Sequence, residues 1–146
     1  TKASAYIPET YMAEQSSKLQ MYKKIAAIRS RDDEDDVIDE LIDRFGDVPQ
    51  ETINLIKISH IRYLASLLAI TEIHQHENKI LFKFAEKNGL SGFGLMNATE
   101  KYGAKLFIHG GKEPFVRLTV NPRKNTEETL QFLEILAENR KTGAAV

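Results

Sequence analysis

The stretch from Val37 to Ile70 constrains the fold most strongly, because it contains two helical patterns joined by a short break. In the first pattern, apolar residues recur with the spacing of an amphipathic helix at Val37, Ile38, Leu41, Ile42 and Phe45. Gly46 is suited to ending that helix, and Pro49 to beginning the next one. We therefore predict helices from about Ser30 to Phe45 and from about Pro49 to Ala69, each with a buried apolar side.

The residues before this stretch predict one more helix and its connection. Residues 5–12 look extended, because Pro8 disfavours a helix at the preceding residue, and residues 6–7 are a candidate edge strand. Apolar residues at helical spacing predict an amphipathic helix from about Glu14 to Arg29. Ser30 followed by Asp33 resembles a capping box at the start of the next helix. The helix that begins at Pro49 is apolar on nearly two faces, which is typical of a central helix.

After Ile70 the hydrophobic period changes from that of a helix to that of a strand. The predicted elements are strands at 71–76 and 79–84, a helix at 91–102, strands at 105–109 and 115–120, and a helix from Asn125 or Thr126 to about Asn139. We therefore predict an α+β fold: an N-terminal three-helix block followed by two β-hairpins, which form a mainly antiparallel sheet and alternate with two further helices.

Composition excludes several classes of protein. The chain has no cysteine, so disulfides, thiolate zinc sites and cysteine nucleophiles are ruled out. No apolar run is long enough to span a membrane, and we expect a cytoplasmic protein without a membrane partner. The sequence begins at Thr1 without an apolar leader and without methionine, so we expect a piece of a larger protein.

Catalytic and metal-binding motifs are absent or incomplete. The chain contains no GxxxxGK[ST], HExxH or GxSxG motif, and we expect no catalytic residue and no cofactor. His74 and His76 would share one side of a strand, with a third metal ligand available only from distant residues such as His60, His109 or Glu72. Because no closed ligand set is visible, surface histidines are the preferred interpretation and no metal site is predicted.

Basic residues near the last hairpin support an alternative function as an accessory nucleic-acid-binding module. These residues are Arg117, Arg123 and Lys124, with Lys101, Lys105 and Lys112 nearby. They are scattered among acids, and the chain has a pI near 6.4. Since a nucleic-acid-binding domain normally carries a dominant basic surface, this alternative is the weaker one.

A block of acids is the most prominent charged feature. Eight acidic residues and no basic residue lie between Asp32 and Asp43. Asp36, Glu40 and Asp43 follow the i, i+4, i+7 spacing that lines one side of a helix, and Asp39 lies beside them. The acids either form a solvated surface or bind arginines of a partner, whose planar guanidinium pairs bidentately with a carboxylate. Charge and spacing leave both possibilities open.

The residues around this block also resemble a known family. Residues 40–46, ELIDRFG, followed by Pro49, are similar to the signature of the C-terminal (TRCF) domain of bacterial transcription-repair coupling factors, the Mfd family. The resemblance extends over residues 5–88, whereas residues 89–146 match in layout only. Ala69 stands where the family commonly has a helix-ending glycine, and His60 and Leu67 stand where basic residues are frequent.

The resemblance implies a function for the chain. Family members are ATP-driven DNA translocases that recognise stalled RNA polymerase and recruit repair proteins through UvrA. Their C-terminal domain packs on an N-terminal UvrB-homology module, hides the UvrA-binding surface and restrains translocation. Acids of the signature helix face arginines of that module, which implies partner-binding roles for Glu40 and Asp43, with Asp36 and Asp39 beside them. Phe45, Gly46 and Pro49 belong to the structural part of the signature.

We therefore expect a single regulatory domain over residues 1–146 that is no enzyme by itself. Its expected parts are an extended leader (1–13), a helical part (14–70), a hairpin and helix part (71–140) and a frayed tail (141–146). UvrA, RNA polymerase and DNA would be indirect partners, through the parent protein.

Overall fold

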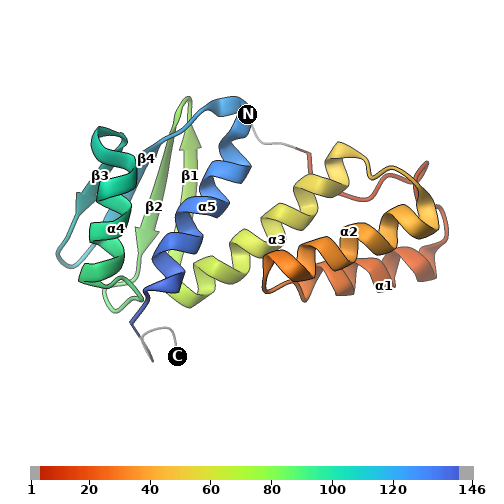
Figure 1. Ribbon diagram of the computed structural model, residues 1–146, viewed down its shortest axis with the longest axis horizontal. Coiled ribbons are helices and arrows are strands. Elements are labelled where there is room, and N and C mark those ends of the chain that lie inside the picture. The colour runs from red at the N-terminus through yellow and green to blue at the C-terminus, as the bar shows by residue number, and fades with distance from the viewer. Residues whose placement is uncertain (1–3, 142–146) are drawn as a thin grey trace. The chain divides into compact units, whose positions relative to one another are not determined.

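The computed structural model describes residues 4–141, and Figure 1 shows their helices and strands. The elements are α1 (Gln15–Ala26), α2 (Arg31–Phe45), α3 (Gln50–Leu68), β1 (Ile70–His76), β2 (Lys79–Phe84), α4 (Gly92–Tyr102), η1 (Gly103–Lys105), β3 (Leu106–His109), β4 (Phe115–Thr119), η2 (Pro122–Lys124) and α5 (Asn125–Glu138). This order confirms the predicted α+β fold of three helices followed by two hairpins alternating with helices. Of the expected frayed tail (141–146), residues 142–146 lie outside the described residues, and the N–H of Lys141 donates to the carbonyl of Gly89 at 2.9 Å.

The chain divides into two compact units, with the boundary between Tyr63 and Leu64, inside α3. We call the described residues 4–63 the helical unit and residues 64–141 the sheet unit. Within residues 4–141, none of the helices combines the length and the hydropathy needed to cross a membrane.

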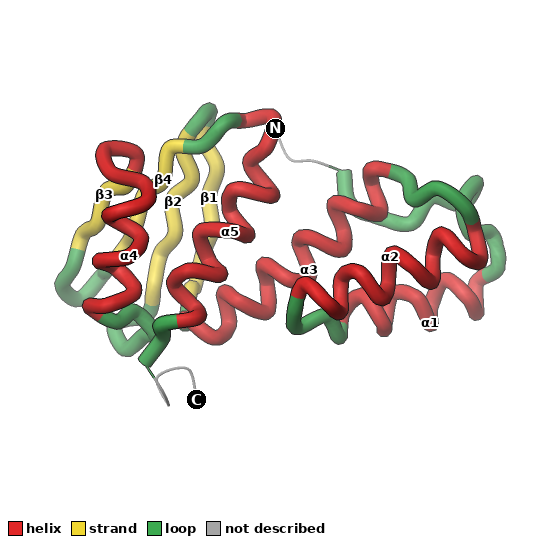
Figure 2. The backbone as a smooth tube through the Cα atoms, in the orientation of Figure 1, coloured by secondary structure: helices red, strands yellow, loops and turns green. Residues whose placement is uncertain are grey.

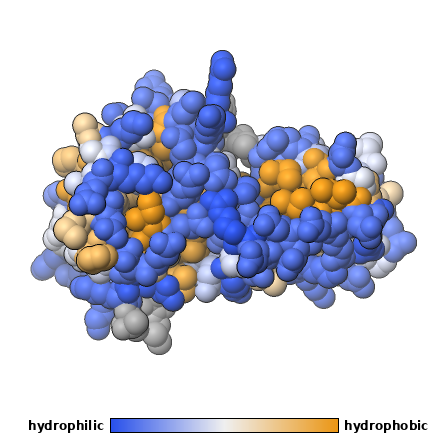
Figure 3. Space-filling model, in the orientation of Figure 1, coloured by the Kyte–Doolittle hydropathy of each residue, from blue (hydrophilic) through white to orange (hydrophobic). Residues whose placement is uncertain are grey.

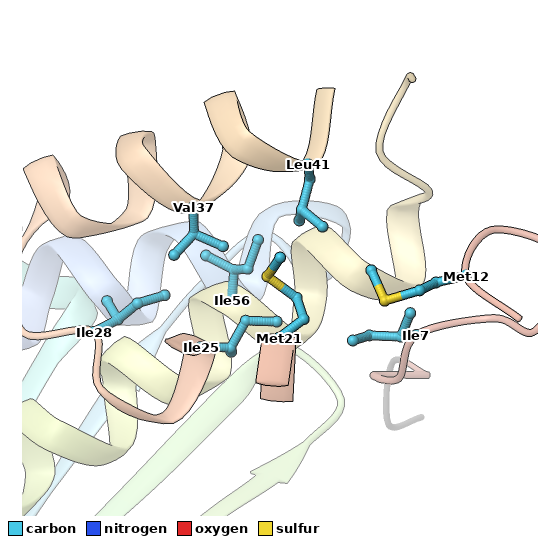
Figure 4. Close-up of a cluster of buried hydrophobic side chains, with 8 residues drawn as sticks. All are labelled: Ile7, Met12, Met21, Ile25, Ile28, Val37, Leu41 and Ile56. Atoms are coloured by element: carbon cyan, nitrogen blue, oxygen red, sulfur yellow. The ribbon is translucent and has the colours of Figure 1, made fainter. Parts of the chain in front are cut away.

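The core of the helical unit is formed by apolar side chains from the leader, the three helices and the connection between α1 and α2. Figure 4 shows the eight buried residues that make up this cluster: Ile7, Met12, Met21, Ile25, Ile28, Val37, Leu41 and Ile56. On α2 the predicted apolar stripe is confirmed at Val37 and Leu41, and Ile38 and Phe45 are half-buried against the cluster. Ile42 departs from the prediction because it lies at the border of the stripe, where 49% of it is exposed.

The leader is held by hydrogen bonds to helices, so the suggested edge strand at residues 6–7 was wrong. The N–H of Tyr6 donates to the carbonyl of Glu51 at 3.2 Å. The N–H of Ile7 donates to the hydroxyl oxygen of Tyr22 at 2.9 Å. Because α1 and α3 supply the acceptors, the leader needs no strand to satisfy these backbone groups.

Both ends of α2 form as the sequence predicts. The Ser30 hydroxyl accepts a hydrogen bond from the N–H of Asp33 at 3.1 Å. The Asp33 carboxylate accepts one from the N–H of Arg29 at 2.8 Å, which satisfies a second backbone donor. Gly46 follows the last turn with φ 86° and ψ −161°, a conformation that is open almost only to glycine. Pro49 lies immediately before α3 and accepts the first hydrogen bonds of that helix from Thr52 and Ile53.

The sheet unit is a four-stranded antiparallel sheet in the order β1-β2-β4-β3. Ile80, Phe82 and Phe84 alternate along β2 and are buried on one face, as predicted. Figure 2 shows α4 and α5 on this face, and the ring of Phe132 on α5 lies 5.3 Å from that of Phe82. Leu81 and Lys83, which alternate with these buried residues along β2, point to the opposite, uncovered face of the sheet.

Candidate docking surface

Three of the predicted partner-binding acids are exposed on α2. Asp36, Asp39 and Asp43 occur at i, i+3 and i+7, so they form one stripe on the side of the helix away from buried Leu41. Within residues 4–141 none of the three has a hydrogen bond or ion pair through its side chain. We call these residues the acidic stripe. Its carboxylates are free to accept donors from a partner.

Glu40, the fourth predicted acid, is already paired within the helical unit. The Nζ of Lys24 on α1 donates to both carboxylate oxygens at 2.8 Å, and Nη1 of Arg44 donates at 2.9 Å. These hydrogen bonds, that from Lys24 first, hold the pKa of the Glu40 carboxyl below its ordinary value. Glu40 therefore joins α1 to α2 in this structure, and an arginine from a partner would have to compete with two cations.

The acidic block is not exposed throughout, which corrects the expectation of a uniformly solvated helix end. Glu34 is buried, with 1% of its surface exposed, and its carboxylate accepts a hydrogen bond from Lys57 at 2.6 Å and pairs with His60. Asp33 is committed to the cap of α2. Only part of the block is thus available to a partner.

Apolar surface lies next to the acidic stripe. Ile42 is one turn from Asp39 and neighbours Asp43 on α2, and about half of it is exposed. Figure 3 shows an apolar patch on the helical unit, over α2 and α3. On the side of Glu40, a shallow groove of about 270 Å³ is lined by residues of α1, α2 and their connection: Lys24, Ala27, Ile28, Asp33, Asp36, Val37 and Glu40. A partner can therefore meet charged and apolar groups together, as most protein interfaces require.

His74 and His76, the two histidines first considered as metal ligands, lie on the uncovered face of the sheet unit, whereas His60 is buried in the helical unit. The Nε2 of His74 is 2.9 Å from a carboxylate oxygen of Glu72, and both side chains are exposed. No group of three or more His, Cys, Asp or Glu side chains within residues 4–141 is placed to hold a metal ion.

The basic residues around the last hairpin are exposed but occupy different parts of the sheet unit. Arg117 lies on the uncovered face of β4, whereas Lys101 lies on α4 and Arg123 lies in η2. The fold thus does not gather the six residues into one basic patch.

The comparison with protein families identifies the chain. The family model of the TRCF domain matches residues 1–94, a span that contains α1 to α3 and the first hairpin. This chain belongs to the TRCF domain family. The resemblance seen at residues 40–46 is thereby confirmed, and the acidic stripe lies inside the matched span.

Relatives of the TRCF domain occur in transcription-repair-coupling factors. The transcription-repair-coupling factor of Staphylococcus haemolyticus (strain JCSC1435) is 29% identical to this chain over 131 residues, which are 88% of this chain and 11% of the relative. That of Escherichia coli (strain K12) is 27% identical over 134 residues, 91% of this chain and 12% of the relative. That of Staphylococcus aureus (strain USA300) is 30% identical over 131 residues, 88% of this chain and 11% of the relative. The chain thus spans a small part of the length of these relatives.

The fold is also that of a solved TRCF structure. A crystal structure of the C-terminal domain of transcription-repair coupling factor matches with a TM-score of 0.81 at 24% identity. The match covers 98% of this chain and 92% of that chain. The likeness therefore includes residues 89–141, for which the sequence motifs gave only a similar layout.

The FGxxP turn of the TRCF signature is fastened by Tyr11 from the leader. The Tyr11 hydroxyl lies 3.2 Å from the carbonyl oxygen of Leu41 and 2.9 Å from that of Gly46, and its ring is 5.8 Å from the ring of Phe45. Burial, and secondarily the charge of Asp47, raises the pKa of this hydroxyl. Phe45 and Gly46 thus take part in holding the end of α2 in place, while Pro49 lies at the start of α3; Phe45 and Pro49 are half-buried and Gly46 is exposed.

Sequence reasoning missed the residues that pair with Glu40 and Glu34, the acids of the block that lie outside the acidic stripe. The Glu40–Arg44 pair has i, i+4 spacing and was readable from the sequence, whereas Lys24 meets Glu40 only because α1 packs beside α2. Ile42 is exposed because it lies at the edge of the apolar stripe of α2. His60, the partner of Glu34, and Lys24, the partner of Glu40, lie on other helices, so no local sequence pattern identifies them.

Proposed function

We propose that this chain is the regulatory, autoinhibitory domain of a bacterial ATP-dependent DNA translocase, a transcription-repair coupling factor of the cytoplasm. The domain docks on an N-terminal UvrB-homology module of the parent protein, masks its UvrA-binding surface and restrains translocation. Engagement of stalled RNA polymerase releases the contact. The observation that carries the proposal is the unpaired, exposed acidic stripe of α2, which lies within the span matched by the TRCF family.

The chemistry of the stripe suits a reversible latch. Carboxylates of Asp36, Asp39 and Asp43 accept hydrogen bonds from arginines, whose guanidinium groups donate in pairs. An exposed ion pair contributes only about 0–1 kcal/mol, so a few of them beside Ile42 hold a resting state without locking it. A second ligand that prefers the open state then shifts the population.

Glu40 has a different part in this proposal from Asp43. A docking arginine must share the Glu40 carboxylate with Lys24 and Arg44, or displace them. Asp43 is free of such competition. We infer that Asp43 contributes more to docking than Glu40, and that Glu40 keeps α1 and α2 together beneath the stripe.

We propose that the domain performs no catalysis itself. ATP binding and the helicase-type hydrolysis that drives DNA translocation belong to other parts of the parent protein, through which RNA polymerase is also engaged. Purified on its own, the chain should hydrolyse no ATP with or without DNA. It should retain the UvrB-homology module in a pull-down, and the retention should weaken as salt screens the ion pairs.

The double variant Glu40→Ala with Asp43→Ala tests the latch in the parent protein. We expect higher ATPase activity without polymerase and tighter binding of UvrA, because the resting contact is lost. The isolated double variant should keep the circular dichroism spectrum of the native chain. Each single variant separates the two roles: Asp43→Ala should give most of the activation.

The matched control is Glu86→Ala, which removes an exposed carboxylate from the sheet unit. It should leave ATPase activity and UvrA affinity at the level of the native parent protein. If the double variant also leaves both quantities unchanged while remaining folded, the latch proposal is wrong.

A further inference from the structure

The sheet unit has a second surface that the docking proposal does not use: the face of the sheet opposite α4 and α5. The strand registers place its residues in rows across the four strands. One row is His74, Leu81, Arg117 and Phe107, and the next is Glu72, Lys83, Phe115 and His109. All eight residues are exposed or half-buried. The charged residues among them are of a kind that a buried apolar sheet face would not contain.

Four planar groups on β3 and β4 form a continuous array on this face. The imidazole of His109 is stacked on the ring of Phe115, with centroids 4.9 Å apart and planes inclined by 20°. The ring of Phe107 lies 6.0 Å from that of Phe115, and the guanidinium of Arg117 lies over Phe107 at 4.8 Å. Phe107 is 47% exposed. We call these four residues the planar array.

The charge around the planar array is mainly positive. Lys79, Lys83 and Arg117 project from the face and are exposed, whereas its only strand carboxylate is that of Glu72. Glu72 is engaged by His74 at 2.9 Å and by Lys83 at 3.7 Å. Among residues 4–141, no carboxylate forms an ion pair with Lys79 or Arg117. The face thus favours an anionic ligand.

A hollow of about 410 Å³ extends the face at one end of the planar array. It is lined by Thr71, Glu72, Lys83, Phe84, His109, Lys112, Glu113, Pro114 and Phe115. The ring of Phe115, two lysines and two carboxylates therefore stand around a space open to solvent, and one of these carboxylates, that of Glu72, is already engaged by His74 and Lys83. A base and its phosphate need such a combination of flat and cationic groups.

We infer that this face binds single-stranded nucleic acid. Bases stack on the planar array, and backbone phosphates contact Lys79, Lys83 and Arg117. Exposed aromatic groups on a four-stranded antiparallel sheet suit unpaired bases, whose flat faces are free. A duplex keeps those faces covered, and an acidic peptide would leave the planar array unused. The inference concerns the sheet unit alone and does not depend on the latch of the helical unit.

Fluorescence anisotropy of a labelled single-stranded oligothymidylate, titrated with the whole chain at low salt, tests the inference. Phe107→Ala should weaken binding by about 5- to 100-fold, the usual effect of removing one stacked aromatic group. Arg117→Gln should weaken binding and lower the slope of log affinity against log salt by about 0.7, as for one lost phosphate contact. Since Phe107 and Arg117 are exposed, both variants should keep the native circular dichroism spectrum.

The matched controls remove one exposed phenylalanine and one exposed cationic side chain from the helix-covered side of the unit. Phe93 is 61% exposed on α4, and Lys101 lies on the same helix. Phe93→Ala and Lys101→Gln should bind the oligonucleotide as the native chain does. Equal losses in these variants would overturn the assignment of the site to this face.

Two competitor ligands distinguish the other occupants. A duplex of the same length and a polyglutamate peptide should displace the single strand only weakly at equal charge concentration. Equal competition by the peptide would mean a general anion-binding surface, and equal binding of the duplex without loss in Phe107→Ala would mean phosphate contacts alone. Either result, or no binding of the single strand at low salt, would overturn the inference.

Discussion

The carboxylate of Glu34 on α2 is paired with Nδ1 of His60 on α3 in the interior of the helical unit. Only 1% of Glu34 and 2% of His60 is exposed. The Nζ of Lys57, one turn before His60, donates to the other carboxylate oxygen at 2.6 Å. Removing a carboxylate from water is costly, so these hydrogen bonds are what permits Glu34 to lie inside. The pair links the two helices on which the candidate docking surface is built.

Loss of Glu34 should therefore be strongly destabilising. We expect Glu34→Ala to lower the free energy of unfolding by about 3–5 kcal/mol, because it leaves buried polar groups without their partner. Urea unfolding followed by circular dichroism measures the change. Asp35→Ala, which removes the exposed carboxylate next in sequence, should change the free energy by less than about 0.5 kcal/mol.

A second variant separates the ionic contribution from packing. Glu34→Met combined with His60→Leu replaces the pair by apolar side chains, and the amine of Lys57 can turn to solvent because its side chain is 21% exposed. Buried ion pairs are often replaced in this way with little loss. The double variant should thus be more stable than Glu34→Ala. A double variant as unstable as Glu34→Ala would show that the site tolerates no apolar substitute.

The hydrogen bonds to Glu40 predict a pH dependence of stability. Lys24 first, and then Arg44, hold the pKa of the Glu40 carboxyl below its ordinary value of 4.5. A carboxyl whose pKa is lower in the folded chain stabilises the fold above its unfolded pKa, and this contribution is lost as pH falls through the folded pKa. The stability difference between native chain and Glu40→Gln should therefore be constant above pH 4.5 and shrink below it.

Urea unfolding at a series of pH values measures this difference. Asp39→Asn is the matched control, since Asp39 is an exposed carboxylate of the same helix without an ion pair in the described part of the chain. The stability difference between the native chain and Asp39→Asn should not show a comparable decrease as the pH is lowered. A Glu40→Gln chain whose stability deficit grows as the pH is lowered would contradict the assignment.

The sequence predicted the elements well, because their signals are local. Ser30 and Asp33 specify the cap of α2, and Val37 and Leu41 specify its buried side. Glu34 shows where local reasoning ends. It lies seven residues before Leu41, so its spacing placed it on the buried side, while its charge argued for exposure. The partner that reconciles the two is His60, 26 residues further along the chain, and no local pattern identifies it.

The candidate surfaces were predictable to different degrees for the same reason. Helical spacing was sufficient to place Asp36 and Asp43 outward. The planar array was not foreseen, although the alternation of Phe107 with His109 and of Phe115 with Arg117 is visible in the sequence. The array requires the β3–β4 register that sets Phe107 opposite Arg117 and His109 opposite Phe115. The lysines beside it come from β2, which joins the same face only because β4 also pairs with β2. Strand order is a tertiary property and not a periodicity.

The end of α3 offers a stabilising substitution. Ala69 follows the last residue of α3 with φ 59°, in the left-handed region, where the TRCF resemblance suggested a glycine. The left-handed conformation costs an L-residue about 1–2 kcal/mol, and a glycine avoids this cost. Part of the gain is lost, because glycine also makes the unfolded chain more flexible. Ala69→Gly should raise the free energy of unfolding by up to about 1 kcal/mol. Ala27→Gly is the control, since Ala27 ends α1 at φ −89°, and it should not stabilise the chain.

Under the docking proposal, the exposed side chain of Ile42 on α2 should contribute to the affinity for the partner module. It is 49% exposed beside the acidic stripe, and a few residues of an interface commonly carry most of its binding energy, with the surrounding contacts nearly neutral. Ile42→Ala should weaken binding of a UvrB-homology module by about fivefold, a loss near 1 kcal/mol.

Isothermal titration calorimetry of the chain with that module measures the effect of Ile42→Ala, and Leu19→Ala is the control. Leu19 is 59% exposed on α1, five residues before Lys24 and hence about 140° around the helix from the side that faces α2. It should bind as the native chain does. Because ion pairs weaken with salt and apolar contacts do not, the deficit of Ile42→Ala should persist at high salt, whereas that of Asp43→Ala should diminish. Equal deficits of Ile42→Ala and Leu19→Ala would place the docking surface elsewhere.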